Sequence, residues 1–475
     1  MPGPSHPHHP LDSQFVRDQL ALRAVPANDR RLQPEGEYVL YWMQACDRLE
    51  ENWALRYATL EANRLNRPLI IHHGLGPSDP LANDRQHQFI LEGAKELAEQ
   101  AEALGYDYHF WLRRTTKEPG GAIDQLARRA AVVVTDDLPT AGVNARTQRF
   151  AERAPCRVMR VESFCVVPAA SFHKEEYAAR TIRPKLAKLR DLALEPVRDE
   201  PPRKRVSSAL RRSLEIDTLD VSRIDIAKEV ARCDIDHSVG ASAFPSGRSA
   251  AHARLDSFLH TGAAEYSTRR EEPADVDGSS QLSPYLHFGH IAPAEVARAA
   301  LAQMPRAESD VFLDQLLTWR ELSFNFCSRN PRFDKLRALP QWAIDSLAKH
   351  TNDAREAVYT LAELEQGQTH DPLWNAAQHQ LVRTGMIHNV MRMLWGKSVI
   401  LWSNTYATAL RNLLYLNNKY AIDGFDPASY ANILWCFGKF DRPFAKRPVW
   451  GIIRPMSLAR AREKFHADLY IAQWS

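Results

Sequence analysis

Three tryptophans toward the C-terminal end have a spacing that could carry electrons. Trp395 and Trp402 are seven residues apart, which is two helical turns, or roughly 10 Å along a helix axis. Trp374 lies on a preceding segment. Indoles at such separations can relay an electron between a buried redox group and the surface. His388 and Arg392 share the same helical stripe, which by spacing alone would more simply be an aromatic core.

A serine-rich turn could hold phosphate groups. The segment Gly278–Gly289 reads GSSQLSPYLHFG. Serine hydroxyls and backbone N–H groups at a turn that opens a helix make a natural phosphate cradle. Read alone, the serines are better explained as a plain helix cap.

Charged and aromatic residues supply two further candidates. Arg392 interrupts an apolar helical face, and a buried guanidinium requires a carboxylate because an unpaired buried charge is costly. The stretch 439–464 contains eight lysines and arginines interleaved with aromatic residues. Such a stretch suits a track for DNA phosphates, and a solvated surface is the alternative.

Composition sets the class of protein. The 475 residues favour two or three domains, and the 44% apolar and 25% charged fractions are ordinary for globular proteins. A net charge of +3 does not by itself identify a nucleic-acid binder. The six cysteines form no C-x-x-C pair and no Cys/His grouping with metal-site spacing, which is typical of reduced thiols. With no apolar run of about 20 residues, we expect a cytoplasmic monomer that binds neither metal nor membrane.

Secondary-structure patterns divide the chain. Short β-branched or aromatic runs alternate with helical stretches from about residue 38 to 168, which predicts a parallel sheet. No G-x-G-x-x-G follows the first run, which disfavours a dinucleotide site there. Helical patterns dominate after about residue 216. We expect a disordered tail (1–35), an α/β domain (36–169), a linker whose early part is helical (170–214) and an α-helical domain (215–475).

At these motifs the sequence resembles the photolyase/cryptochrome family, and class II photolyases in particular. Their W-N-A-A-Q segment matches residues 374–378, and their M-H-x-x-M-R-M-x-W helix matches 387–395 with Ile387 for the first Met. Their L-D-G-x-D-P stretch matches Ile422–Pro427. The resemblance implies an FAD-binding helical domain, in which the cofactor contacts Tyr266, Ser279, Gln281, Leu282, Ser283, Asn389, Arg392 and Asp423, with Arg392 paired to Asp423.

The same resemblance implies a light-driven activity, the repair of cyclobutane pyrimidine dimers in DNA by an electron from reduced FAD. It makes Trp374, Trp395 and Trp402 the chain that reduces the flavin beforehand. Asn417 would face flavin N5, and Gln315 would contact the lesion. The lesion would bind between Trp319 and Trp435, with Arg442 and Arg454 on the DNA. The α/β domain would be the place for an antenna chromophore of unknown identity.

Two departures from the family pattern keep other functions open. Photolyases specific for cyclobutane dimers have Glu at the position of Gln315, and glutamine can donate a hydrogen bond but is not a proton donor. The loop before Asp441-Arg442 looks one residue shorter, and Phe444 and Lys446 replace a Trp and an acidic residue. The alternatives are a cryptochrome-like light receptor, a (6-4) photolyase with half of the usual histidine pair, and a light-independent DNA-binding flavoprotein.

Overall fold

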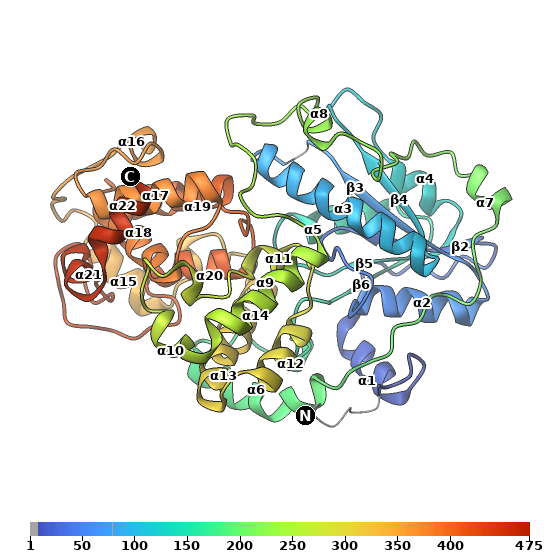
Figure 1. Ribbon diagram of the computed structural model, residues 1–475, viewed down its shortest axis with the longest axis horizontal. Helices are drawn as coiled ribbons and strands as arrows, with labels where there is room; N and C mark the ends of the chain where they lie inside the picture. The colour runs from blue at the N-terminus through green and yellow to red at the C-terminus, as the bar shows by residue number, and fades with distance from the viewer. Residues whose placement is uncertain (1–7, 78) are drawn as a thin grey trace.

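The computed structural model describes residues 8–77 and 79–475, and its elements divide into two halves (Figure 1). One half contains a six-stranded sheet with flanking helices, and the other is built from helices alone. The predicted fold class, an α/β domain followed by a helical domain, is confirmed. Within the described residues, no helix combines the length and the apolar character that a membrane span requires.

The sheet has the strand order β1-β6-β5-β2-β3-β4. The edge strand β1 (Ala24–Pro26) pairs antiparallel with β6, so the sheet is mixed and not wholly parallel. Pro26 is tolerated there because an edge strand leaves some N–H groups without a ladder partner. The other five strands run parallel and coincide with the predicted runs: β2 (Tyr38–Met43), β3 (Leu69–Leu75), β4 (Asp107–Leu112), β5 (Ala130–Asp136) and β6 (Arg157–Val161).

Helices cover both faces of the sheet, because successive strand side chains point to opposite sides. Val39 and Tyr41 pack in one apolar layer with α2 (Trp53–Leu65) and α3 (Asp84–Leu104). Tyr38 and Leu40 pack in the other layer with α4 (Ala122–Ala127) and α5 (Val143–Arg153). The result is a three-layer α/β/α half whose strands are buried on both faces.

The prediction of a disordered tail over residues 1–35 is wrong for the part that the structure describes. Helix α1 (Gln14–Arg23) and strand β1 form there, and Val16 and Leu20 are buried in the α2 layer. Arg23 is buried as well and pairs with Glu162 at 2.7 Å. The polar and proline-rich composition concealed this short helix. Residues 1–7 of the predicted tail lie outside the described residues.

The expected linker, residues 170–214, is also more ordered than predicted. Its early part forms α6 (Ala179–Ala193), which packs on the helical half. The later part carries α7 (Ser208–Arg212) and continues over the α/β half through α8 (Ile226–Val230), where Val221 and Cys233 share an apolar cluster with Phe110. The predicted boundary at residue 215 therefore lies too early, because residues up to about 235 still cover the sheet domain.

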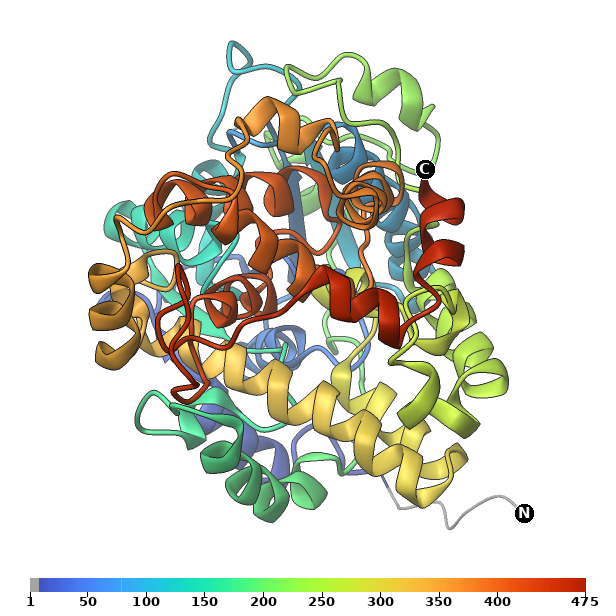
Figure 2. The same ribbon diagram turned by 90° about the vertical axis from the view of Figure 1, so that its left-hand side faces the viewer.

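The helical half packs around two large clusters of apolar and aromatic side chains. Figure 2 views this half from the front. Its helices are α9 (Arg248–Thr261), α10 (Tyr266–Arg269), α11 (Ser283–His287), α12 (Pro293–Gln303), α13 (Arg306–Leu313), α14 (Arg320–Arg329), α15 (Gln341–Lys349), α16 (Leu361–Glu365), α17 (Pro372–Thr384), α18 (Asn389–Leu401), α19 (Tyr406–Tyr420), α20 (Pro427–Cys436), α21 (Leu458–Lys464) and α22 (Ala467–Trp474).

Two irregularities shape the helical half. The helical pattern over 372–402 is broken at Gly385, which takes a φ of 79° and ends α17, so that α18 starts at Asn389 with His388 at its N-cap. A side chain at Gly385 would meet Ile422 and Arg85. Between α13 and α14 the chain forms a π-helical turn over Asp314–Trp319. Such turns are rare and are frequent at functional sites.

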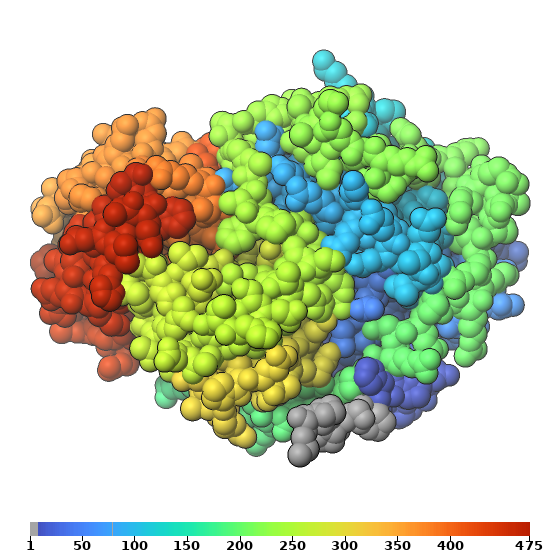
Figure 3. Space-filling model, in the orientation of Figure 1, coloured from blue at the N-terminus to red at the C-terminus, as the bar shows by residue number. Residues whose placement is uncertain are grey.

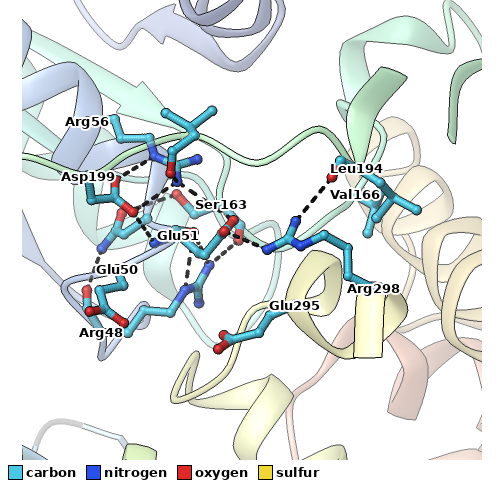
Figure 4. A network of polar contacts seen from close by, with 12 residues as sticks. Arg48, Glu50, Glu51, Arg56, Ser163, Val166, Leu194, Asp199, Glu295 and Arg298 are labelled. Atoms are coloured by element: carbon cyan, nitrogen blue, oxygen red, sulfur yellow. Dashed lines mark hydrogen bonds and ion pairs between the residues drawn. The ribbon is translucent and has the colours of Figure 1, made fainter. Parts of the chain in front are cut away.

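Two arginines hold the two halves together (Figure 4). Arg48 donates to the carbonyl oxygens of Gly289, at 2.8 Å, and Ser163, at 2.7 Å. Arg298 on α12 pairs with Glu51 at 2.6 Å. The Arg48–Gly289 and Arg298–Glu51 contacts cross between the sheet half and the helical half, so these charge-assisted hydrogen bonds fix how one half sits on the other.

A buried carboxyl group lies at the same junction. Glu321 on α14 accepts hydrogen bonds at Oε1 from the backbone N–H groups of Val166, at 2.7 Å, and Val167, at 3.3 Å. Its Oε2 is buried and has no partner among the described residues. Burial raises the pKa of Glu321 to about 8, against the lowering effect of the two backbone N–H groups. Glu321 is therefore largely protonated at neutral pH in the folded protein.

We expect Glu321→Gln to remove a pH dependence of stability. The folded pKa lies above the unfolded one, so the stability that the protonated group contributes is lost as pH rises through about 8. Between about pH 5.5 and about pH 9 the wild-type protein should lose about 3 kcal/mol more than the variant. Urea unfolding at both pH values measures the difference, and equal losses in the two proteins would contradict it.

Candidate active site

A cavity of about 610 Å³ opens within the helical half. Its wall is formed by α10, the turn before α11, the π-helical turn, the junction between α17 and α18, and α20. This volume is in the usual range for a cofactor or ligand site. The hollow therefore lies between the helix of Arg392 and the helix of Trp319, where the sequence predicted a site.

Most of the predicted site residues line this cavity, and some do not. Those in its wall are Tyr266, Ser279, Gln281, Leu282, Ser283, Gln315, Trp319, Asn389, Arg392, Asp423 and Trp435. The three tryptophans of the predicted electron-transfer chain, called the ladder below, lie behind the wall: Trp374, Trp395 and Trp402. Arg442 and Arg454 lie outside the wall. Asn417 is buried on α19, donates to the Oδ1 of Asn418 at 3.1 Å and is not part of the wall.

The serine-rich turn has a backbone that bends sharply into the cavity. Gln281 takes a φ of 53°, in the left-handed region, and its side chain donates to the carbonyl oxygen of Val276 at 2.5 Å. Arg254 on α9 donates to the carbonyl oxygens of Ser279, at 3.2 Å, and Ser280, at 3.0 Å. With these carbonyls turned toward Arg254, the turn is fixed before any ligand arrives.

Arg392 is paired with the carboxylate of Asp423, as its burial requires. Its Nη2 lies 3.1 Å from Oδ1 and 3.4 Å from Oδ2 of Asp423, and both side chains are more than nine-tenths buried. Ser429 donates to the backbone oxygen of Asp423 at 2.9 Å, which holds the turn that carries the carboxylate. The predicted ion pair is thus present in the cavity wall.

The three tryptophans form a contiguous stack behind the cavity. The rings of Trp374 and Trp395 are parallel within 7°, with centroids 6.4 Å apart, and Trp402 meets Trp374 edge-on at 5.6 Å. The indole N–H of Trp374 donates to the backbone oxygen of Trp395, and that of Trp395 to Oε1 of Gln378. In space the order is Trp395, Trp374, Trp402, which the chain order does not reveal.

The stack continues into a tyrosine that sequence reasoning missed. Tyr359 meets Trp402 edge-on at 5.5 Å, and its hydroxyl group lies 2.6 Å from Nδ1 of His370. Tyr359 precedes α16 in a stretch with no helical or strand pattern, so only the fold brings it to Trp402. A phenol next to an imidazole can lose an electron and a proton together, which suits the outer end of an electron relay.

The cavity wall contains other residues without a signal in the sequence. Asn432 lies between Ala428 and Trp435 on the cavity face of α20, and Arg270 also lines the cavity. Trp474 is a further lining residue. Trp474 belongs to α22, which packs on α17. The side chain of Gln473, on the same helix, donates a hydrogen bond to the backbone oxygen of Ala274. Figures 2 and 3 show this C-terminal segment, in red, beside the yellow-green segment around residues 260–290.

The basic stretch 439–464 is only partly available for a ligand. Lys439 is buried against Glu175, Arg462 pairs with Asp371, and Lys464 pairs with Glu271. These pairs attach the stretch to the rest of the helical half. Exposed cations remain at Arg442, Lys446, Arg447 and Arg460.

Arg454 stands at the rim of the cavity next to Trp435. It forms two hydrogen bonds to the carboxylate of Asp441, at 2.7 and 3.0 Å. Its guanidinium carbon lies 4.3 Å from the ring centroid of Phe444 and 5.8 Å from that of Trp435. Phe444, at the position where the resemblance expects Trp, thus forms a cation–π contact that fixes the rim.

Comparison with known proteins agrees with this architecture. Residues 39–203 match the family model described as DNA photolyase. The chain is 35% identical over 446 residues to a deoxyribodipyrimidine photo-lyase of Methanothermobacter thermautotrophicus, covering 92% of this chain and 94% of that protein. It is 37% identical to a deoxyribodipyrimidine photo-lyase of Arabidopsis thaliana, covering 91% and 88%.

Among solved structures, the fold is similar to that of an archaeal photolyase from Sulfolobus tokodaii, determined with two FAD molecules. The TM-score is 0.65 at 17% identity, and the match covers 92% of this chain and 89% of that one. At this identity the likeness concerns the fold, including both halves and their relative placement.

Proposed function

The chain belongs to the DNA photolyase family, and from that premise we propose that it repairs cyclobutane pyrimidine dimers with light, using reduced FAD bound in the cavity of the helical half. The observation that carries the proposal is the coincidence of three features around one hollow. A buried Arg392–Asp423 pair and a bent serine turn line it, and a tryptophan stack lies behind it.

The residues present fit FAD. Serine hydroxyls and the Gln281 turn lie in one part of the wall and suit the diphosphate, while Arg392 and Asp423 suit the polar edge of the isoalloxazine ring. Nδ1 of His388 and Nε1 of Trp474 belong to wall residues and are buried without a partner in the described part of the chain. Unsatisfied buried polar atoms are costly, and a ligand with ribityl, ribose and adenine groups can satisfy them.

When bound, reduced FAD supplies an electron after absorbing light. Because that electron would be recovered after the two carbon–carbon bonds that join the pyrimidines break, the repair would involve no net oxidation or reduction. The protein's role would be to position the lesion beside the cofactor and to exclude water from it. Extrusion of the lesion from the duplex is eased because a dimer pairs poorly with the opposite bases.

Trp319 and Trp435 are the proposed walls of the lesion pocket, since both are half-buried indoles of the same cavity. Aromatic faces hold extruded bases by stacking. Gln315 lies in the same wall, one turn before Trp319 on the π-helical turn, and its NH₂ group can donate to the pyrimidine carbonyls. Arg442 and Arg454 are proposed to contact the DNA outside the cavity.

The α/β half is the proposed place for an antenna chromophore. The sheet ends point toward a junction with the helical half that already holds buried polar groups, including His73, which is 2.9 Å from the hydroxyl group of Tyr108. In open α/β sheets, ligands bind outside the carboxyl ends of the strands.

Irradiation of defined DNA is the direct test. Reduced protein and blue light should restore thymines in an oligonucleotide with one cyclobutane dimer, and not in the dark. A (6-4) photoproduct in a parallel reaction should stay unrepaired. Repair of that lesion alone would favour a (6-4) photolyase, and photoreduction without any repair would favour a cryptochrome-like receptor. A protein that binds DNA and flavin but shows no photochemistry would be a light-independent flavoprotein.

We expect Asp423→Asn to weaken flavin binding by at least about tenfold. The substitution leaves the buried guanidinium of Arg392 without its counter-charge, and such a loss typically destabilises the folded site by several kcal/mol. The cavity wall that would hold the flavin is then no longer fixed in place. The ratio of flavin absorbance to protein absorbance after purification measures the loss. Asp345→Asn, an exposed carboxylate on α15, is the matched control and should keep the wild-type ratio.

We expect Trp374→Phe to block photoreduction of oxidised flavin by a factor of about 100, because it removes the middle of the stack while Trp395 and Trp402 remain. Bleaching of the flavin absorbance under blue light with an added thiol is the readout. Trp342→Phe, a half-buried indole of the same core outside the stack, is the control. Unchanged bleaching in Trp374→Phe would contradict the ladder.

A further inference from the structure

A buried lysine lies behind the proposed lesion pocket. Lys397 on α18 is 1% exposed, and its Nζ is 5.0 Å from the ring centroids of both Trp435 and Trp450. Among residues 8–77 and 79–475, no carboxylate lies within ion-pairing distance of this ammonium group. An unpaired buried cation is costly, and the catalytic scheme above gives it no role.

Two carbonyl groups hold the ammonium group in place. Nζ donates to the backbone oxygens of Cys436, at the end of α20, and Arg454, at the cavity rim, both at 2.7 Å. Burial lowers the pKa of Lys397 to about 8, so the group is still mostly charged at neutral pH. A positive charge is therefore fixed between the two indole faces.

The ladder tryptophans have the opposite environment. Trp374 and Trp395 donate their indole N–H groups to oxygen atoms, at 3.0 and 2.9 Å. In the described part of the chain, no lysine or arginine stands over the ring of Trp374, Trp395 or Trp402, whereas Lys397 stands over Trp435 and Trp450. The guanidinium of Arg454 also lies 5.8 Å from the Trp435 centroid, but it is paired with the carboxylate of Asp441. The two groups of indoles thus differ in the charge that faces them.

This difference matters when an indole loses an electron. The oxidised ring is a cation, and a like charge about 5 Å away in a buried site raises its free energy. Oxygen acceptors on the indole N–H lower the free energy of the same cation. Trp435 lines the cavity proposed for the flavin and is therefore exposed to oxidation by the excited cofactor.

We propose that Lys397 protects Trp435 and Trp450 from photo-oxidation and so directs electron withdrawal to the ladder of Trp395, Trp374 and Trp402. The inference rests on the proposed flavin photoreduction. One electron leaves the ladder for the photoexcited oxidised cofactor, and an added thiol replaces it, with two thiols joining as a disulfide after losing their protons. Lys397 touches neither cofactor nor substrate and is a tuning residue that acts through the two indoles.

The photochemical test uses a blocked ladder. In Trp374→Phe, photoreduction is low, and adding Lys397→Met should raise it at least about tenfold by admitting Trp435 as a donor. Adding Trp435→Phe to that double variant should bring it back to the blocked level. Lys349→Met, an exposed lysine of α15, is the control in the same background and should change nothing.

A second measurement needs neither a lysine substitution nor light. Fluorine NMR of the purified, fluorotryptophan-labelled protein in the dark should show the Trp435 and Trp450 signals moving together as pH rises from about 6.5 to about 9.5, when Lys397 loses its proton. The charged or titratable groups facing Lys397 are Cys436 on α20, with Asp441 and Arg454 in the following loop. The pKa of Cys436 is raised to about 11 and Arg454 stays charged. Signals assigned to Trp374 and Trp395 should move less.

The outcomes separate this inference from the proposed function. No photoreduction in the unaltered protein would overturn both. A block in Trp374→Phe that Lys397→Met does not relieve, in a protein with unchanged melting temperature, would overturn this inference alone. If the double variant unfolds, raising the pH of Trp374→Phe should restore photoreduction in step with the NMR shift, and a flat profile would overturn the inference.

Discussion

The contact between Arg392 and Asp423 is the constraint on which the helical half depends. A guanidinium that is more than nine-tenths buried must lie near a carboxylate, so α18 and the turn before α20 are fixed to one another. That turn begins α20 through Asp426, whose carboxylate accepts the N–H of Ala428. With these two helices in place, Trp435 on α20 lines the cavity, and Trp395 on α18 lies behind the cavity wall.

Helix α18 therefore presents different chemistry along its length. Arg392 faces the cavity, Trp395 begins the indole stack, and Lys397 reaches the back of Trp435. Each of these side chains is buried, so none is free to change its environment when a ligand binds. The proposed electron relay would benefit from this rigidity, because fixed dipoles and charges, and not mobile water, would then set the energies of the indole cations.

Sequence reasoning recovered the features that depend on local pattern. The five parallel strands follow from runs of β-branched and aromatic residues, and the Arg392–Asp423 pair follows from the cost of a buried charge combined with the family resemblance. The end of α17 at Gly385 has no clear signal in the sequence, because a single glycine inside a helical pattern is usually tolerated. Tyr359 and Trp474 were missed because their contacts join segments that have no common periodicity. The prediction of a disordered tail was wrong because overall composition gives no signal for a helix of ten residues that packs on an existing layer.

The character of the proposed lesion pocket follows from which side chains carry charge. The cavity wall carries five carboxamides, each of which can both donate and accept: Gln281, Gln315, Gln380, Asn389 and Asn432. The imide edge of a pyrimidine also alternates acceptors with a donor, so carboxamides suit it without any proton having to move. A glutamic acid at position 315 would have to be protonated to donate, which its neighbours would have to enforce by raising its pKa. With glutamine there, the proposed lesion binding needs no such arrangement. The charged side chains of the cavity wall are those of Arg270, Arg320, Arg392, Asp423 and Asp426.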